Sequence, residues 1–158
     1  MRVSRLRILP LLAIATVALV APASGDAWRP APDAMPAAAK QTKLKLASSP
    51  YGRVLFANGY AMYLFTKDDG KKSRCYGACA KAWPPLEARG EVLAGSGVDA
   101  ALIGRTERRD GTKQVTYAGE PLYGYVHDPR GEVLCHDVFE FGGDWLAVLG
   151  SGEPAPSP

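Results

Sequence analysis

The chain has 158 residues, about the length of one domain, which excludes a large multidomain enzyme. A hydrophobic fraction of 47% and a charged fraction of 22% are ordinary for a globular protein and exclude wholesale disorder. The formal net charge is +3, from 19 basic and 16 acidic residues. Whether this excess indicates an anionic partner depends on where the charge lies.

Residues 1–23 are typical of a secretory signal peptide. Three arginines precede the apolar run 8–20, and Ala21-Pro22-Ala23 fits a small-x-small cleavage pattern. The run is shorter than the roughly 20 residues of a membrane-spanning helix. The sequence therefore predicts cleavage near Ala23, a periplasmic or secreted protein, and no transmembrane span in the mature chain.

The net positive charge belongs to this leader. Removing Arg2, Arg5 and Arg7 from 19 basic residues leaves 16, equal to the 16 acidic residues. The remaining charge is polarised, with +6 over residues 24–89 and −6 over residues 90–158. We interpret this split as two complementary halves or a solvated surface, with a basic face for an anionic partner as the alternative. No nucleic-acid motif is present, so nucleic acid is not a predicted partner.

The rest of the chain divides by composition and by a repeat. Residues 24–43 are rich in Pro and Ala and predict a flexible spacer, and residues 151–158 (SGEPAPSP) predict a disordered tail. Between them, residues 44–150 predict one domain. An offset of 60 aligns NGYAMYLFTKD (58–68) with AGEPLYGYVHD (118–128), which indicates two copies at about 50–90 and 110–150.

The predicted elements of the domain are mostly strands. Asn58-Gly59 predicts a tight hairpin turn followed by a strand over 60–66, and 118–120 is a weaker version of that turn. Further strands are predicted over 132–135 and 145–149, with a turn over 141–144 between them. Short helical turns are predicted over 76–82 and 99–103. We expect a mostly β fold, a single small domain built from two copies of a hairpin-based repeat with one or two short helices.

Both copies carry the pattern Y-x-[FWY]-x-x-D. The matching residues are Tyr63, Phe65 and Asp68, and Tyr123, Tyr125 and Asp128. With CYGAC (75–79), WPPL (83–86) and FGGDW (141–145), residues 44–150 resemble the bacterial secreted or lipoprotein repeat family named for that pattern. The resemblance implies no established biochemical activity. It also implies frequent lipid anchoring, from which this chain departs by lacking a lipobox cysteine.

The motif residues favour a structural role. Tyr63 and Phe65 are two apart on a strand and so share one face, and Asp68 at the strand exit is placed to cap a turn. Trp83 and Trp145 are expected to fill the core, with the Pro84-Pro85 pair as a rigid exit. The alternatives are a peptide-recognition role for the WPPL segment and a cation or acid–base site formed by Asp68 and Asp128. The second requires the two carboxylates to converge.

Three cysteines leave one without a partner in an exported protein. Pairing of Cys75 with Cys79, or of either with Cys135, stays open at the level of sequence. Cys-x3-Cys with a distant histidine also resembles the spacing in secreted copper-delivery proteins of the thioredoxin fold. Cys75 and Cys79 with His136, or with His127, would suit Cu(I), although the βαβ context of that fold is missing.

The leading prediction is an exported, monomeric, non-catalytic module that binds an envelope or extracellular partner and needs no cofactor. It rests on the leader and on repeated aromatic and turn positions without a catalytic constellation. The alternative is a periplasmic copper-binding or thiol-redox protein with copper as its cofactor.

Overall fold

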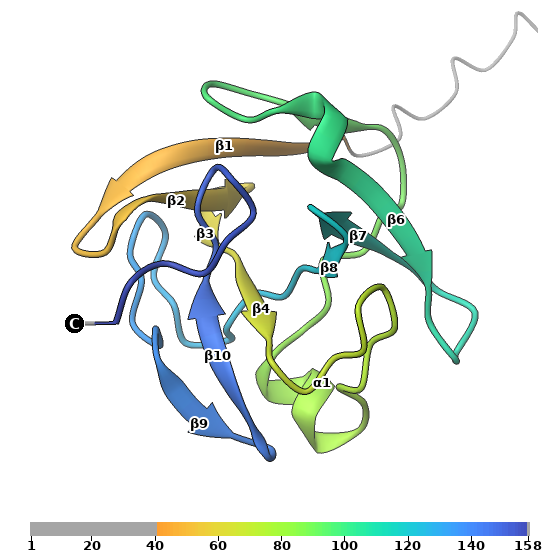
Figure 1. Cartoon of the computed structure of the whole chain (residues 1–158). Coiled ribbons are helices and arrows are strands. Elements are labelled where there is room, and N and C mark those ends of the chain that lie inside the picture. Colours follow the sequence, from red (N-terminus) through yellow and green to blue (C-terminus); the bar gives the residue numbers. More distant parts are fainter. Residues whose placement is uncertain (1–40, 158) are drawn as a thin grey trace, which may run out of the picture. The chain divides into compact units, whose positions relative to one another are not determined.

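The computed structural model describes residues 41–157, which form a mostly β structure with two related halves (Figure 1). The predicted leader and residues 24–40 of the predicted spacer lie outside the described residues. The elements, in chain order, are β1 (Thr42–Ser49), β2 (Gly52–Ala57), β3 (Tyr60–Ala61), β4 (Tyr63–Phe65), α1 (Ala78–Ala82), β5 (Val92–Ala94), the 3₁₀ turn η1 (Ala100–Leu102), β6 (Ile103–Glu107), β7 (Lys113–Tyr117), β8 (Glu120–Pro121), β9 (Val138–Glu140) and β10 (Gly143–Ala147).

The strands pair in three small sheets, in the orders β3-β2-β1-β5, β6-β7-β8 and β4-β10-β9. The antiparallel arrangement of β1, β2 and β3 in the first copy recurs as β6, β7 and β8 in the second. The third sheet joins the copies, because β4 of the first pairs with β10 of the second and places Phe65 opposite Trp145. The predicted two-copy, mostly β fold is confirmed.

The predicted hairpin turns explain the repeat at the level of the backbone. Asn58 and Gly59 adopt φ values of 53° and 93°, and Ala118 and Gly119 adopt 51° and 92°. Two consecutive positive φ values are what a two-residue turn needs to match the twist of its strands. Ala118 holds this conformation without the freedom of glycine or asparagine.

The strand predicted over 60–66 is interrupted at Met62. The Met62 amide donates to the Leu55 carbonyl at 2.9 Å, and its own carbonyl accepts from Val148 at 3.2 Å. From Tyr63 onward the chain pairs with the other copy, so β3 and β4 belong to different sheets. The strand predicted over 132–135 does not form, and β9 takes its place after a further turn. The strand predicted over 145–149 starts earlier and ends at Ala147.

Each copy begins with a strand that the predicted bounds of 50–90 and 110–150 omit. These strands are β1 and β6, and Thr42 and Lys43 of the predicted spacer lie in β1. In β1, Leu44 is buried between two exposed lysines, which is the alternation of a strand with one covered face. The helical turns predicted over 76–82 and 99–103 correspond to α1 and η1.

The C-terminal segment differs from the predicted disordered tail. The Leu149 amide donates to the Glu153 carbonyl at 2.8 Å, and the Ala155 amide donates to the Ala147 carbonyl at 2.7 Å. The Ala155 side chain is only 5% exposed. Composition suggested disorder, but residues 153–155 satisfy the free edge of the preceding strand, which stabilises them.

Two apolar clusters form the core. One contains the aromatic motif residues, both core tryptophans and the paired cysteines. The other is aliphatic, with Leu44, Leu55 and Leu122 fully buried beside Tyr117. Among the described residues, no helix has the length and apolar character to cross a membrane.

Candidate functional site

The two Y-x-[FWY]-x-x-D motifs bind each other across the copies. The Tyr63 hydroxyl donates to Asp128 Oδ2 at 2.6 Å, and the Tyr123 hydroxyl donates to Asp68 Oδ2 at 2.7 Å. The backbones of Tyr63 and Tyr123 also exchange hydrogen bonds of 2.9 and 3.0 Å. The tyrosine of each motif therefore serves the aspartate of the other, a reciprocity that spacing within one copy does not show.

Each aspartate also holds the loop that follows it. Asp68 Oδ1 accepts from the Arg74 amide at 2.8 Å, and Asp128 Oδ1 accepts from the Leu134 amide at 3.1 Å. Burial raises the pKa of Asp68 to about 6, against the lowering effect of the Arg74 and Tyr123 hydrogen bonds. Burial likewise raises the pKa of Asp128 and of both tyrosines, so the hydroxyls remain donors.

The two carboxylates occupy separate environments. The charged neighbours that shift the pKa of Asp68 are Glu120 and Arg108, whereas the one acting on Asp128 is Glu132. The two carboxylates have no hydrogen-bond donor in common: Asp68 accepts from Tyr123 and the Arg74 amide, and Asp128 accepts from Tyr63 and the Leu134 amide.

The aromatic motif residues surround a stacked pair of indoles. The rings of Trp83 and Trp145 stack at 4.0 Å with an interplanar angle of 5°. Phe65 stacks on Trp145 at 4.2 Å and Tyr125 packs on Trp83 at 4.5 Å, so each copy covers the tryptophan of the other. Both indole N–H groups donate to Glu140, Trp83 to its side chain and Trp145 to its backbone carbonyl. Trp83 and Trp145 are fully buried, and these contacts build the core.

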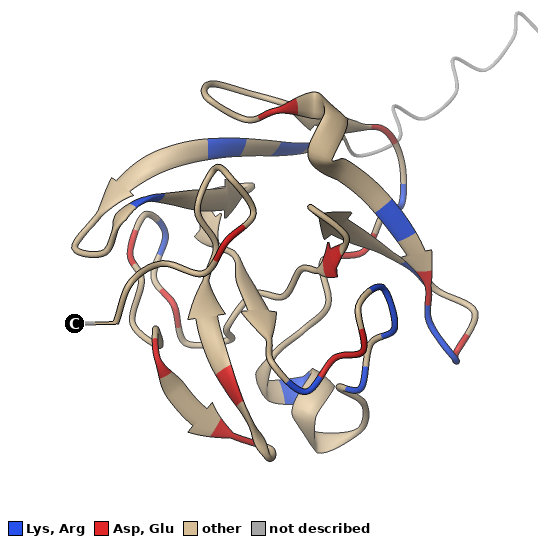
Figure 2. Cartoon of the chain, in the orientation of Figure 1, with Lys and Arg blue, Asp and Glu red and all other residues tan. Residues whose placement is uncertain are grey.

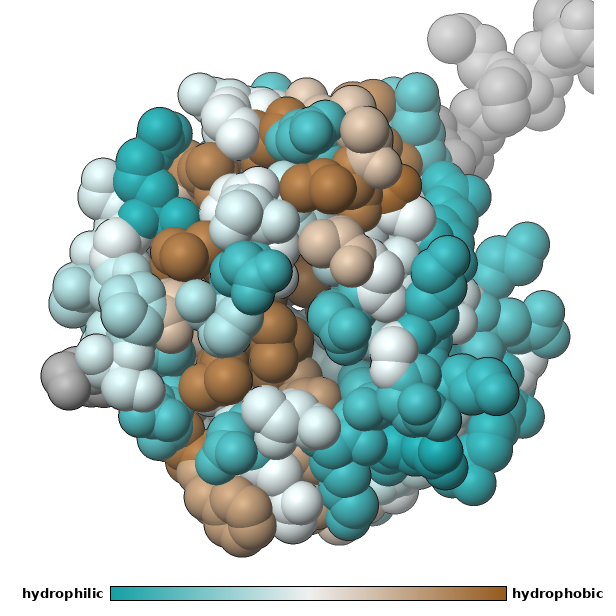
Figure 3. All heavy atoms as spheres, in the orientation of Figure 1, coloured by the Kyte–Doolittle hydropathy of each residue, from teal (hydrophilic) through white to brown (hydrophobic). Residues whose placement is uncertain are grey.

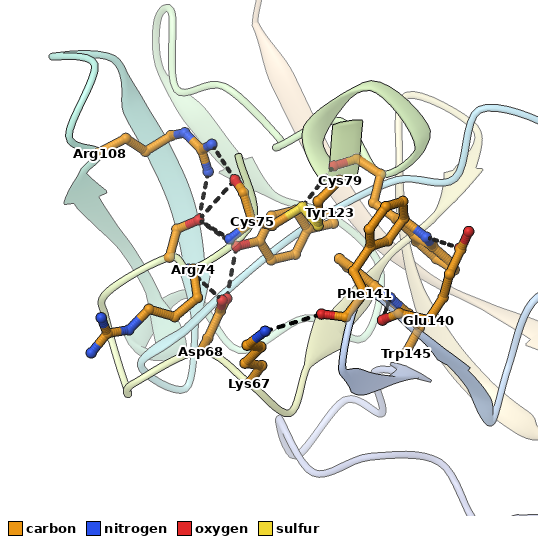
Figure 4. The surroundings of a disulfide bond; sticks show 12 residues. Lys67, Asp68, Arg74, Cys75, Cys79, Arg108, Tyr123, Glu140, Phe141 and Trp145 are labelled. Atoms are coloured by element: carbon orange, nitrogen blue, oxygen red, sulfur yellow. Dashed lines mark hydrogen bonds between the residues drawn. A yellow bond between two sulfur atoms is a disulfide. The ribbon is translucent and has the colours of Figure 1, made fainter. Parts of the chain in front are cut away.

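The structure pairs Cys75 with Cys79, with a Cα–Cα distance of 5.2 Å (Figure 4). Cys135 remains a partly exposed thiol. Burial raises the pKa of Cys135, which lowers the fraction of reactive thiolate at neutral pH. Cys135 is the counterpart of Cys75 in the second copy, but that copy has no counterpart of Cys79.

The predicted copper ligands already have other partners in this state. The disulfide joins both sulfur atoms of Cys75 and Cys79. His136 Nδ1 accepts from the Ala147 amide at 3.1 Å, which leaves Nε2 to donate to the Pro156 carbonyl at 2.9 Å. In the part of the chain that the structure describes, no three His, Cys, Asp or Glu side chains gather in a way that could hold a metal ion. A copper site would need reduction of the disulfide and release of His136.

Sequence reasoning missed a buried polar network beside the disulfide. Arg108 is 4% exposed and donates to the Ser73 hydroxyl at 2.8 Å, to Gln114 Oε1 at 2.7 Å and to the Cys75 carbonyl at 2.7 Å. The Ser73 and Tyr123 hydroxyls also share a hydrogen bond of 2.7 Å, which links Arg108 to the motif (Figure 4). The sequence signal was weak, because a surface turn is the usual place for an Arg-Arg pair.

A basic hollow of about 560 Å³ opens beside this network, between the loop after β4 and the tip of the β6–β7 hairpin. Its lining residues are Lys67, Lys72, Ser73, Arg74, Tyr76, Glu107, Arg108 and Arg109. Lys and Arg cluster on these two segments, whereas β9 and β10 carry acidic residues (Figure 2). The space-filling view shows a hydrophilic surface over the same region (Figure 3).

Tyr76 organises the arginines of the hollow. Its ring lies 4.4 Å from the Arg108 guanidinium carbon and 4.0 Å from that of Arg109. The Arg109 amide donates to the Tyr76 hydroxyl at 3.0 Å. The stacked Arg109 guanidinium has already lost rotamer freedom. Binding of an anion to it therefore costs less side-chain conformational entropy.

The buried Arg108 adds charge from behind the hollow. Its Nε has no hydrogen-bond partner among the described residues and lies 3.6 Å from Asp110 Oδ2. Arg74 pairs with Asp69 at 3.1 Å, and Lys67 donates to the Phe141 carbonyl at 3.2 Å. Lys72 and Arg109 are exposed and form no ion pair with the described side chains, so they are the cations best placed to meet an anion.

Comparison with known protein families supports the repeat. A family model described as a secreted repeat of unknown function matches residues 45–87 and 104–148, one segment in each copy and together more than half of the chain. No curated protein and no solved structure matches the chain. The matched segments contain both tyrosine motifs and both core tryptophans, which confirms the resemblance. The chain therefore belongs to this family of secreted repeats of unknown function and carries two copies of the repeat.

Proposed function

We propose that the protein is an exported, non-catalytic binding module that holds an anionic group of an envelope or extracellular partner in the basic hollow. The observation that supports this proposal is that five cationic side chains line the basic hollow: Lys67, Lys72, Arg74, Arg108 and Arg109. These residues come from both copies, so the folded two-copy domain is needed to assemble the site. Export through a leader cleaved near Ala23 would deliver it to the periplasm or beyond.

The difference between the copies supports a role beyond folding. Each half contributes a tyrosine and an aspartate to the Tyr–Asp exchange and one indole to the stack, whereas the cations of the hollow are not repeated in this way. At an offset of 60, Lys72, Ser73 and Tyr76 correspond to Glu132, Val133 and His136. The fold does not require cations at these positions, since the second copy forms the same loop contact with other residues.

The shape of the site favours an inserted anionic group. An array of cations in a concavity attracts phosphate or carboxylate, and a preorganised guanidinium binds either with two parallel hydrogen bonds. Exposed cations act through a screened field, so binding should weaken as ionic strength rises. The chemistry shared by the candidate ligands is a multiply charged oxyanion.

Binding of tripolyphosphate, measured by calorimetry at low ionic strength, tests this proposal. The variant Lys72→Gln/Arg109→Gln removes two exposed cations of the hollow, and Lys45→Gln/Arg53→Gln removes one lysine and one arginine from the exposed positions of β1 and β2. We expect the first pair to lower affinity about tenfold or more, because each hydrogen bond to a charged group contributes about 1.5–3 kcal/mol. The matched control should change affinity by less than about threefold. Equal losses in both variants would contradict a localised site.

A further inference from the structure

The C-terminal segment covers the outer edge of residues 147–149 as an added strand. The Leu149 amide donates to the Glu153 carbonyl at 2.8 Å, and the Ala155 amide donates to the Ala147 carbonyl at 2.7 Å. The bridge formed by the intervening proline is antiparallel. A short segment that offers one backbone donor and one acceptor is therefore sufficient to complete this edge.

The segment 85–87 occupies the equivalent place in the first copy. The Leu86 amide donates to the Leu122 carbonyl at 2.9 Å, and the Leu86 carbonyl accepts from the Val115 amide at 2.8 Å. Val148 makes the same two bonds, at 3.2 and 2.7 Å, to the residues 60 positions before these partners. Leu86 thus corresponds to Val148, and its backbone groups point inward.

The outer edge of this segment carries backbone groups without a partner among the described residues. Neighbouring residues of a strand direct their backbone groups to opposite sides, so Pro85 and Glu87 present theirs outward. Within residues 41–157, no hydrogen bond reaches the Pro85 carbonyl or the Glu87 amide. After Gly90 the chain pairs as β5 with β1 and does not return over this edge. An edge of this kind can accept an added strand.

A hollow of about 310 Å³ lies beside the open edge. Its lining residues are Thr42, Asn58, Pro85, Leu86, Glu87 and Arg89. In the second copy, Ala118 stands in the position of Asn58 and packs closely against the C-terminal segment, because a Cβ added at Gly152 would lie 2.2 Å from the Ala118 Cβ. The hollow beside Asn58 therefore corresponds to the place that the C-terminal segment occupies in the other copy.

A larger hollow of about 790 Å³ adjoins the first, since Asn58, Pro85 and Leu86 line both. Tyr60 and Val126, which are 40% and 48% exposed, also line the larger hollow and give it apolar surface. A peptide that adds to a strand edge gains affinity from backbone hydrogen bonds and specificity from such side-chain contacts. The combination of open edge and apolar hollow is therefore suited to a peptide.

We propose that the outer edge of residues 85–87 binds an extended peptide segment of a partner protein, in which a small residue lies between two prolines. The amide of the small residue donates to the Pro85 carbonyl, and the carbonyl two positions before it accepts from the Glu87 amide. The small residue is required because its counterpart Ala155 is only 5% exposed. The prolines need no acceptor, and their fixed φ reduces the conformational entropy lost on binding.

This peptide site is separate from the basic hollow, because no residue lines both. Its probe is the neutral peptide acetyl-Ser-Gly-Gln-Pro-Ala-Pro-Ser-amide, which follows residues 151–157 with glutamine in place of Glu153. The replacement avoids a like-charge pair with Glu87, which would lie opposite. The control peptide carries N-methylalanine in place of alanine, so it keeps the shape of the backbone but lacks the one donor.

NMR titration of the exported chain with both peptides tests the proposal. Chemical shifts give the affinity, and hydrogen exchange at the Glu87 amide reports directly on the open edge. Glu87→Pro removes that amide at an edge position where proline is tolerated, and Glu87→Gln is its control, which keeps the amide. Exchange at Leu149, whose amide bonds to Glu153, reports on the integrity of the fold in each protein.

We expect saturating peptide to slow exchange at the Glu87 amide about tenfold or more, with Leu149 unchanged. The N-methylated peptide should bind about tenfold or more weakly, because it loses a hydrogen bond and its methyl group meets the Pro85 carbonyl. Glu87→Pro should weaken binding similarly. Glu87→Gln and the anion-site variant Lys72→Gln/Arg109→Gln should bind the peptide as the unmodified chain does.

Equal affinity of the two peptides, or unchanged exchange at Glu87 at the highest peptide concentration, would overturn the proposal. Faster exchange at Leu149 in the presence of peptide would also overturn it, because the peptide would then have displaced the C-terminal segment of the chain. Loss of peptide binding in Lys72→Gln/Arg109→Gln would assign the peptide to the basic hollow instead and would likewise overturn it.

Discussion

At the scale of single residues, Asp68 connects the two copies through a carboxyl group whose charged form is disfavoured by burial. Its carboxylate is partly buried, and burial raises its pKa to about 6. Hydrogen bonds from the Tyr123 hydroxyl and the Arg74 amide offset part of that cost. An aspartate in this position can therefore join two segments that are far apart in sequence, provided both donors are present.

Asp68 should make the stability of the domain fall as the pH rises from about 4 to about 6. The carboxyl binds its proton more tightly in the folded state, where its pKa is about 6, than at its ordinary value of 3.8. The stabilisation from this group is thus complete below about pH 4 and lost as the pH passes about 6. The groups that face it are Tyr123, the Arg74 amide, Glu120 and Arg108.

Urea unfolding of Asp68→Asn at pH 4 and pH 7 checks this expectation. The amide can accept from the Arg74 N–H and donate to the Tyr123 hydroxyl, so the variant keeps both contacts without a charge. The difference in free energy of unfolding between the two pH values should shift relative to the unmodified protein. Asp69→Asn, at an exposed neighbouring position, should leave that difference unchanged. A slope in Asp68→Asn equal to that of the unmodified chain would contradict the assignment.

At the scale of elements, α1 depends on covalent closure more than on helix propensity. It has five residues, follows Gly77 at a φ of 60°, and has no side-chain cap at its N-terminus. Isolated helices of this length are unstable in water. The Cys75–Cys79 disulfide closes the turn that leads into α1, and the Cys75 carbonyl accepts from Arg108. The disulfide therefore also supports one wall of the basic hollow.

Replacing both cysteines with alanine should lower the free energy of unfolding by about 2 kcal/mol, the loop-entropy value for so short a loop. A long-range bridge to Cys135 would have contributed about 4 kcal/mol by the same relation. Urea unfolding without reductant measures the loss, and Cys135→Ala, at a partly exposed position, is the control. Thiol titration of the unfolded protein should find one free thiol. Three free thiols, or equal destabilisation by Cys135→Ala, would contradict the pairing.

The sequence predicts the elements that are determined by neighbouring residues, such as the hairpin turns. Asn58-Gly59 specified its turn, and the offset of 60 revealed the repeat because both copies need the same turn. The first strand of each copy was missed, since β1 directly follows the Pro/Ala-rich stretch. The break at Met62 was also missed, because it arises from pairing with Val148, 86 positions along the chain. Non-local pairing of this kind leaves no local pattern.

The candidate site was harder to predict than the fold. The sequence singled out Tyr63, Asp68 and Trp83, but the residues that each of them contacts in the other copy could not be read from the sequence. Arg108 was not singled out, because its burial depends on Ser73 and Gln114, which are ordinary polar residues in the sequence. The charge split between the halves does not predict the hollow, because Arg108 and Arg109 come from the −6 half and join Lys67, Lys72 and Arg74 of the +6 half.

For the molecule as a whole, we expect the two copies to unfold as one cooperative unit, because they contact each other through exchanged residues. Each tyrosine binds the aspartate of the other copy, β4 pairs with β10, and the two indoles stack on each other. Neither copy keeps its core when the other unfolds, since each supplies a ring that covers the tryptophan of its partner. Stability should therefore be a property of the pair.

Tyr63→Phe should destabilise both copies equally. The variant leaves Asp128 with the Leu134 amide as its remaining hydrogen-bond donor, a loss of about 1–3 kcal/mol for a buried carboxylate. Under conditions where exchange reports global unfolding, the amides of Leu55 in the first copy and Val115 in the second should both exchange faster, by the same factor. Tyr60→Phe, whose residue is 40% exposed, is the matched control and should leave both rates nearly unchanged. If exchange in Tyr63→Phe accelerated at only one of these amides, the copies would unfold separately, and the exchanged motif would stabilise a local contact rather than the whole domain.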